Sequence, residues 1–456
     1  MDSGDFSARG ILRSAAQQQQ QTIDPDAIEA RATRVSVSGV SRIREGVVNT
    51  LAHRILLART VSDVAMEARE AAGRLQALGM AKAAYVVLDH TGDGANGARL
   101  IDVALECVDG PRYSVRTEAG VNDAEGTAGV TARLINIFGG GEAADFHYTR
   151  GSRTRAALQA GISLPVAADP LRSVSFAAAQ RSITCAPYSA HDELLRELLV
   201  RYTAAAGTHT ANNLEYVLAW RNVCNLGAAA SPTLRSESGH SLKSALCHTF
   251  AWDTRDSARM PTRGSLLKLT TECAGLIDAL GDARFVKTRA EFQTNQHLGS
   301  SYVVSAGVQA GLLWNIDPKA RSFLADRFFL GGSTSVRGFE HHGIGPRDGN
   351  DSIGGDAFYA AGVSLLTPLP LVTTDAIRGH VWANAGQLAL LDSRGLKRSH
   401  SDVHRFLMSP SAAVGFGLVY NHSMVRAELS LCFPITATLT DRPKPGLQFG
   451  LGMTFL

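Results

Sequence analysis

The sequence predicts a membrane all-β protein, an antiparallel transmembrane β-barrel of about sixteen strands preceded by one small α+β domain. Three observations support this fold class. Long segments after residue 111 alternate apolar and polar residues with a period of two, as strands between two different environments do. Residues 31–110 have a different, partly helical pattern. No apolar stretch reaches the roughly 18 residues that a helical membrane span needs.

Composition narrows the function class. The 456 residues have room for one large domain and a small one. A formal net charge of +3 is too small at this length to indicate a nucleic-acid surface. The 6 cysteines lie far apart, without metal-ligand spacing, and are predicted to be reduced thiols. The N-terminus shows no basic segment followed by an apolar one, and the glutamine run at residues 17–21 indicates a disordered leader over residues 1–30.

Residues 31–110 are predicted to form a compact β-α-α-β-β module. Residues 34–39 alternate like a strand, and apolar residues then recur at helical spacing from Ile43 to Ile55. A second helix is predicted over residues 61–78, with Thr60 as its N-cap, Asp63 in its first turn and Gly79 in the left-handed turn after it. Strands over residues 83–89 and 99–107 complete the module.

Residues 111–456 are predicted to form the barrel. In one segment Val425, Leu429 and Phe433 share a face, whereas Arg426, Glu428 and Ser430 share the other. A soluble β-sandwich is the alternative. Its usual strands have about 5–6 residues, shorter than the alternating segments here, and no second layer of segments would cover the apolar faces. A barrel in lipid is therefore the better interpretation.

Three short segments depart from this pattern. Residues 192–202 have leucines at helical spacing and are predicted to form a short amphipathic helix in a loop. His341 and His342 have no metal-ligand set at suitable spacing and are predicted to be a polar loop pair. Asp253 and Asp256 are predicted to belong to a charged turn.

The run Val336-Arg337-Gly338-Phe339 resembles the core of the loop that marks the BamA-type outer-membrane barrel insertases. Three further stretches resemble the mitochondrial branch, the central barrel subunit of the sorting and assembly machinery. They lie within residues 238–256, 354–370 and 446–456, and the resemblance covers about residues 30–456 in the same order. It implies that residues 31–110 are a single polypeptide-transport-associated (POTRA) domain. One such domain without a visible secretory signal favours the mitochondrial branch.

The resemblance also implies a function. The expected role is the insertion of β-barrel precursors into the mitochondrial outer membrane, with the POTRA-like domain in the intermembrane space. Unfolded precursors, accessory subunits and outer-membrane lipid are the expected partners, with no nucleic acid, no enzymatic activity and no cofactor. The alternative is a transporter of the same superfamily that secretes a polypeptide through its lumen.

Members of this family fold the marked loop into the barrel, where its arginine pins it to the inner wall. A guanidinium cannot shed its charge, so a buried Arg337 needs a carboxylate or carbonyl partner. Wall carboxylates of bacterial members correspond here to Ser364 and Asn384, so the resemblance predicts that Asp356 or a backbone carbonyl substitutes, or that the latch is looser. The predicted latch residues are Gly331, Gly332, Val336, Arg337, Gly338 and Phe339, and the candidate partners are Asp356, Ser364 and Asn384.

A lateral gate is expected between the first and last strands. Glycines on the lumen face of the last strand leave little side-chain packing, which weakens its contact with the first strand. Residues 448–455 and 444–451 both fit the final-strand signal of mitochondrial barrel precursors, and a client strand would pair by β-augmentation. The predicted gate residues are Gly446, Gly450, Gly452, Met453 and Phe455 on the last strand and Tyr113, Val115 and Val121 on the first.

Overall fold

A computed structural model describes residues 28–456 except 95–96, 123–124, 278–280, 300, 318–321, 370–375, 392–403, 405, 423–424 and 453–456. Most of the expected leader, up to residue 27, lies outside the described residues. The chain forms two compact units. One comprises the described residues up to Arg112 with the turns Ile135–Glu142 and Pro165–Pro170, and the other comprises the remaining described residues. Within the described residues, no helix combines the length and apolarity that a membrane span requires.

The first unit has its elements in the predicted β-α-α-β-β order. They are β1 (Ala30–Ser38), α2 (Glu45–Leu57), α3 (Val61–Ala77), β2 (Ala81–Asp93) and β3 (Arg99–Asp109). The sheet order is β1-β3-β2, with β1 parallel and β2 antiparallel to β3. The Thr60 hydroxyl accepts a hydrogen bond from the Asp63 amide at 3.1 Å, and Gly79 has φ +71°, so both predicted ends of α3 are confirmed.

The core of this unit lies between the two helices and the sheet. Each helix turns one apolar face inward, and Leu51, Ile55, Val64 and Leu75 are at most 1% exposed. The inward positions recur every three or four residues, as expected for one face of an α-helix. Alternate residues of β3, such as Leu105, cover the other side of this core.

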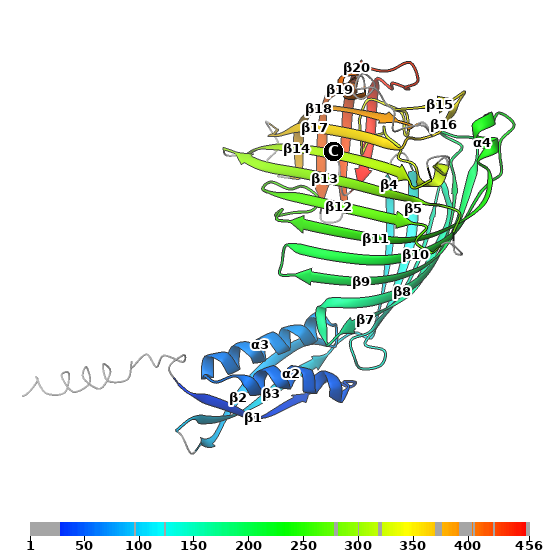
Figure 1. Cartoon of the computed structure of the whole chain (residues 1–456). Coiled ribbons are helices and arrows are strands. Elements are labelled where there is room, and N and C mark those ends of the chain that lie inside the picture. The colour runs from blue at the N-terminus through cyan, green and yellow to red at the C-terminus, as the bar shows by residue number, and fades with distance from the viewer. Residues whose placement is uncertain are drawn as a thin grey trace, which may run out of the picture. The chain divides into compact units, whose positions relative to one another are not determined.

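The second unit is a sheet of 16 strands, which confirms the predicted number. The strands are β4 (Tyr113–Asn122), β5 (Glu125–Ile135), β6 (Ala143–Gly151), β7 (Thr154–Val166), β8 (Asp169–Thr184), β9 (Asp192–Ala206), β10 (Thr210–Cys224), β11 (Gly239–Asp253), β12 (Gly264–Ala274), β13 (Phe285–Leu298), β14 (Tyr302–Asn315), β17 (Ala357–Pro368), β18 (Ile377–Ala389), β19 (Ser411–His422), β20 (Val425–Thr436) and β21 (Gly446–Gly452). Neighbouring strands in the sheet follow one another in sequence, and β21 contacts β4, so the sheet closes into a barrel (Figure 1). Shorter elements lie in its connections: α4 (Pro232–Ser236), a 3₁₀ turn η2 (Leu324–Asp326), β15 (Arg347–Asp348) and β16 (Asp351–Ser352).

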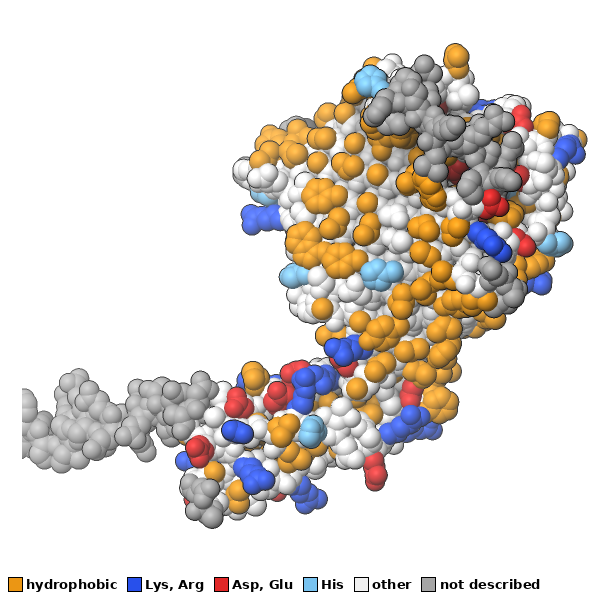
Figure 2. Space-filling view, in the orientation of Figure 1, with side chains coloured by type: hydrophobic (Ala, Val, Ile, Leu, Met, Phe, Trp, Pro, Cys, Tyr) orange, Lys and Arg blue, Asp and Glu red, His pale blue; other side chains and the backbone are white. Residues whose placement is uncertain are grey.

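The barrel has apolar side chains outside and polar side chains inside. On β20, Leu429 and Phe433 are 39% and 46% exposed, whereas Arg426, Glu428 and Ser430 are buried. Apolar side chains spread over the outer face of the strands in Figure 2. A protein in water has the opposite arrangement, so this polarity fits a barrel whose outer face meets lipid.

The predicted amphipathic helix at residues 192–202 was wrong, because these residues belong to β9. They pair with β8 and β10 along their whole length. Leu198, Val200 and Tyr202 point outward, at 58%, 41% and 39% exposure. Because both the outward residues and the inward Leu195 and Leu199 are apolar, apolar residues recur at intervals of three and four residues, as they do on one face of a helix. Pairing with two neighbouring strands overrides that local pattern.

Candidate functional site: a loop bound inside the barrel

The β14–β17 connection carries the marked sequence, and residues 328–345 of it form what we call the lumenal loop. The loop is pinned by isolated bridges between Phe328 and Gly355 and between Leu330 and Ile344. Its glycines hold the turns that the sequence predicted, with φ of +104° at Gly331, +126° at Gly332 and +85° at Gly338. Val336 and Phe339, at 0% and 1% exposure, pack in a core with residues of the barrel wall that include Trp382, Ala413 and Cys432.

Arg337 is 2% exposed, and its guanidinium donates to Glu428 of β20 at 2.8 Å. Its Cζ atom also lies 5.3 Å from the ring centroid of Trp382 on β18. The resemblance predicted that Arg337 would have a substitute partner or a looser contact, because neutral Ser364 and Asn384 stand where bacterial members have wall carboxylates. That prediction was wrong, because another wall strand, β20, supplies a carboxylate. Glu428 already stood on the polar face of this strand in the sequence, but nothing local connects it to a residue 91 positions earlier.

The three candidate partners have other surroundings. Asp356 is buried, and its carboxylate accepts from the Leu391 amide at 3.1 Å while its carbonyl accepts from Leu313 at 2.7 Å. Asn384 is 4% exposed, and its side-chain amide has no hydrogen-bond partner within the described residues. Ser364 lines a small cavity together with Arg337 and Arg426. Of the three candidates, Ser364 is the one that these contacts place beside Arg337.

A second guanidinium shares the same carboxylate. Arg426 donates to Glu428 and also, at 2.9 Å, to the carbonyl of Arg259 in the β11–β12 loop. One buried carboxylate therefore stands between two buried guanidinium groups. Removing it would leave two unscreened positive charges in a low-dielectric interior, which makes Glu428 the centre of the cluster.

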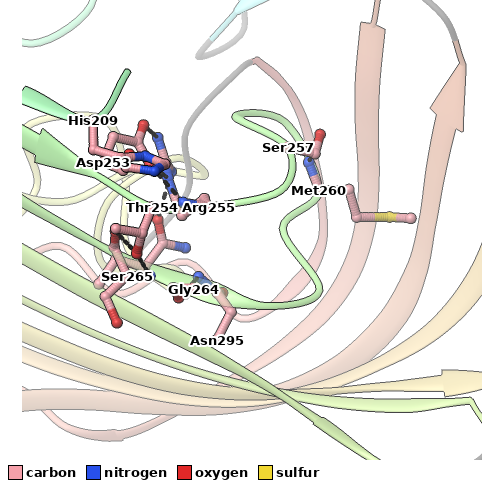
Figure 3. Close-up of polar contacts among 10 residues, drawn as sticks. His209, Asp253, Thr254, Arg255, Ser257, Met260, Gly264, Ser265 and Asn295 are labelled. Carbon is pink, nitrogen blue, oxygen red and sulfur yellow. Dashed lines mark hydrogen bonds and ion pairs between the residues drawn. The ribbon is translucent and has the colours of Figure 1, made fainter. Parts of the chain in front are cut away.

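The β11–β12 loop, residues 254–263, is shown in Figure 3. Arg255 pairs with Asp253 at 2.9 Å and donates to Gln293 at 2.9 Å, so the predicted charged turn is confirmed. Met260 reaches a small core formed with Val303, Leu366 and Val419. The carbonyl of Arg259 binds Arg426, so this loop and the lumenal loop are linked through Glu428.

The last strand holds the lumenal loop directly. The Gln448 side chain on β21 accepts from the Gly338 amide at 3.0 Å and donates to the Phe339 carbonyl at 3.1 Å. Gln448 is 8% exposed, so water does not compete easily for these bonds. Gln448 begins the stretch 448–455 that fits the final-strand signal, but in the sequence only its position on the polar face of the last strand points to this contact.

The β20–β21 connection adds backbone contacts to the same loop. Glu340 donates to the Arg442 carbonyl at 3.0 Å, and Lys444 donates to the Gly338 carbonyl at 2.8 Å. Asp441, at 8% exposure, accepts from the Gly345 amide at 2.9 Å. The lumenal loop is therefore attached to both strands of the last hairpin.

The structure places the predicted gate residues only in part. Gly446, with φ +103°, begins β21, and Gly450 and Gly452 pair with Glu428 and Arg426 of β20. Met453 and Phe455 lie outside the described residues. Tyr113 and Val115 begin β4 and are 72% and 62% exposed, and Val121 lies near its end. β4 and β21 are the two ends of the hydrogen-bonded strand order within the described residues.

A second buried ionic cluster lies at the base of the connection. Asp326 of η2 is 2% exposed and pairs with Arg221 at 2.6 Å and with Lys243 at 3.4 Å. Burial opposes ionisation of this carboxyl, but the positive charges of Arg221 and Lys243 outweigh it and hold the Asp326 pKa below its usual value. The cluster ties the start of the lumenal connection to the wall strands β10 and β11.

Comparison with known proteins identifies the class and then the family. The fold is similar to that of BamA from Haemophilus ducreyi lacking POTRA domains 1–3, with a TM-score of 0.75 at 14% identity over 93% of this chain and 85% of that one. CdiB from Acinetobacter baumannii is similar with a TM-score of 0.52 at 12% identity, over 93% of this chain and 74% of that one. The fold of this chain is thus that of the BamA class.

Sequence comparison is more specific. Residues 136–455 of this chain match the Omp85 superfamily domain. A SAM50-like protein of Schizosaccharomyces pombe is 35% identical over 87% of this chain and 84% of its own length. The human sorting and assembly machinery component 50 homolog is 32% identical over 92% of this chain and 90% of its own length. The chain belongs to the Omp85 superfamily, in the family of sorting and assembly machinery component 50 homologues.

Proposed function

We propose that this chain folds and inserts β-barrel precursor proteins into the mitochondrial outer membrane, as the central barrel of a sorting and assembly machinery. The relatives named for that machinery and the BamA-like fold support the role. The observation that carries the proposal is how the last strand, β21, is paired with its neighbours and held by the lumenal loop. In the described part of the chain, β21 ends the hydrogen-bonded strand order and is held from inside by the lumenal loop.

The proposed mechanism is a lateral gate between β4 and β21. β21 pairs with β20 from Gly446 to Gly452, so its other edge is the one that faces β4. An edge with unpaired backbone groups accepts another strand, so a client strand would pair with the edge of β21 in place of its contact with β4. Glycines at 446, 450 and 452 leave few side-chain contacts to break when the edge opens.

The first unit supports the same role. From its β-α-α-β-β order we propose that it is a POTRA domain in the intermembrane space, where it would meet incoming precursors. Precursors, accessory subunits of the machinery and outer-membrane lipid are the partners that this proposal requires. The apolar outer face of the barrel suits the lipid.

Secretion through the lumen has less support. The lumenal loop fills part of the barrel interior and is fixed by Glu428 and Gln448. The β11–β12 loop crosses toward the same carboxylate from another side. A translocating chain would have to displace both loops, whereas a client strand at the β4–β21 edge would displace neither.

Depletion of the protein tests the function. Mitochondria that lack it should lose assembly of an imported β-barrel precursor and keep import of a matrix protein. Equal loss of both, or normal barrel assembly, would contradict an insertase.

A crosslink tests the gate. In a chain without its native cysteines, cysteine pairs at contacting positions of β4 and β21 should, once oxidised, block client insertion, and reduction should restore it. The control is a pair at Leu418 and Leu429, which are partners in the continuous β19–β20 ladder. Insertion that continues with the β4–β21 crosslink formed would remove the gate and leave the insertase role standing.

A further inference from the structure

The turn between β8 and β9 brings together three side chains that bind metals. Cys185 follows β8, His191 precedes β9, and Glu193 lies at the start of β9. One ligand atom from each lies within 4.8 Å of the other two. The Cys185 amide donates to the His191 carbonyl at 2.9 Å, so the hairpin itself sets these residues opposite each other. His191 and Glu193 are two residues apart, which puts both side chains on one face of the strand.

The distances suit a tetrahedral zinc site. His191 Nε2 lies 3.3 Å from Glu193 Oε1, and two ligand atoms about 2.0–2.2 Å from the same tetrahedral ion are roughly 3.4 Å apart. The other ring nitrogen, Nδ1, lies 3.2 Å from Ser189 Oγ. Metal-bound histidines usually donate their second ring N–H in this way. The Tyr188 hydroxyl donates to Cys185 Sγ at 3.0 Å and would stabilise a thiolate there.

The turn is rigid before any ion binds. Asp351 accepts from the Ala190 amide at 2.7 Å, and Ser352 donates to the Tyr188 carbonyl at 2.9 Å, so the β15–β16 hairpin holds the turn in place. Cys185 is only 1% exposed. The Glu193 side chain is 32% exposed and borders a cavity of about 230 Å³, so the open side of the three ligands is at Glu193. A turn fixed in this way loses little conformational entropy on binding.

We propose that Cys185, His191 and Glu193 bind one divalent transition-metal ion of the Zn²⁺ type, with water in the fourth position on the cavity side. The thiolate and the carboxylate together neutralise the two charges of the ion, so the buried site carries no net charge. The thiolate is the form of cysteine that binds a metal, so binding of the ion releases the thiol proton of Cys185. The bound ion would clip the β8–β9 hairpin together.

Cobalt serves as the spectroscopic probe. The full chain, folded in detergent micelles and titrated with Co²⁺, should show a sulfur-to-cobalt charge-transfer band and visible bands of tetrahedral cobalt that saturate at one equivalent. Zn²⁺ should abolish these bands by displacement. Cys185→Ser and His191→Gln should each remove the charge-transfer and tetrahedral signature, and Ser189→Ala should weaken cobalt binding about tenfold.

Cys224→Ser is the matched control, because this thiol ends the neighbouring strand β10 and is not among the three ligands. The control should keep the full spectrum. No such spectrum in the wild-type chain at stoichiometric cobalt would overturn the proposal, whatever the variants do. The same spectrum in wild type and Cys185→Ser would also overturn it, because the ion would then be bound elsewhere.

Discussion

At the scale of single residues, the decisive feature is one carboxylate between two guanidinium groups. Glu428 is 2% exposed and pairs with both Arg337 and Arg426. Bringing three charged groups into a low-dielectric interior is costly, and the cost is offset only while opposite charges stay in contact. The cluster therefore specifies where the lumenal loop lies, more than it adds to the total stability of the barrel.

Glu428→Gln tests this cluster. We expect the folded barrel to lose about 3–5 kcal/mol of stability, because two buried guanidinium groups lose their shared counter-charge. Urea-induced unfolding of the purified barrel in lipid vesicles measures the change. Ser364→Ala, in the same cavity but uncharged, is the control and should cost less than about 1 kcal/mol. Equal stability of the two variants would show that the ionic cluster does not hold the loop.

Arg337→Ala should impair assembly of the barrel and insertion of clients. Within the described residues, Arg337 makes the one charged contact between the lumenal loop and Glu428, and the variant removes it. Mitochondria that carry only this variant would be assayed for assembly of an imported barrel precursor. Normal assembly there would refute the latch.

Asp326 predicts an acid dependence of stability. Its pKa is lower in the folded chain than the value near 3.9 of an unfolded one, so ionised Asp326 stabilises the fold above about pH 4. This contribution is lost as the pH falls through the lower, folded-state pKa. In Asp326→Asn the loss of stability between about pH 5 and pH 2 should be smaller than in wild type, as measured by the folded fraction on semi-native gels. Asp89→Asn, at an exposed position on β2, is the control and should retain the wild-type slope.

At the scale of elements, the lumenal loop and the last hairpin form one unit. Gln448 binds two backbone groups of the loop, and residues of the β20–β21 connection pair with the same segment. Movement of β21 away from β4 would therefore pull on the loop through Gln448. This connection would give the loop a physical means to influence the proposed gate without any contact with a client.

Gln448→Ala should loosen that unit. The variant leaves the buried Gly338 amide without its acceptor, which costs about 1–3 kcal/mol, so exchange of the amides at residues 336–340 should accelerate about tenfold or more. Hydrogen exchange followed by mass spectrometry measures it. Gln309→Ala is the control, since this glutamine of β14 binds Arg289 at 3.1 Å away from the last hairpin. Unchanged exchange in Gln448→Ala would show that backbone pairing alone holds the loop.

At the scale of the whole barrel, the outer face decides where the protein resides. Leu418 and Phe416 on β19 are 45% and 54% exposed, and Leu429 and Phe433 on the neighbouring strand β20 are 39% and 46% exposed. In water such a surface would favour aggregation, whereas in a bilayer it is satisfied. The polar lumen, by contrast, is partly filled by the loop and its ionic partners.

Phe416→Arg should therefore destabilise the barrel in lipid by about 2–4 kcal/mol, because the charge would lie near the middle of the membrane. Folding titrations into lipid vesicles measure this change. Leu439→Arg is the matched control, since that side chain lies in the β20–β21 connection at 106% exposure and should tolerate a charge. A similar small effect in both variants would mean that β19 does not face lipid.

The sequence by itself determined the features that depend on local periodicity. A strand exposes alternate residues to opposite sides, so the rows on β14, β18 and β20 could be read directly, as could the ends of α3 and the turns of Gly331 and Gly338. Tertiary structure decided the features that depend on pairing across the fold. The partner of Arg337 is 91 residues away, Gln448 meets Gly338 across 110 residues, and Cys185 meets His191 only because a hairpin folds between them. Residues 192–202 show the same limit, since the spacing of leucines on one strand does not reveal the two strands that flank it. Local geometry fixes which way a side chain points, and only the register and path of the folded chain fix what it meets there.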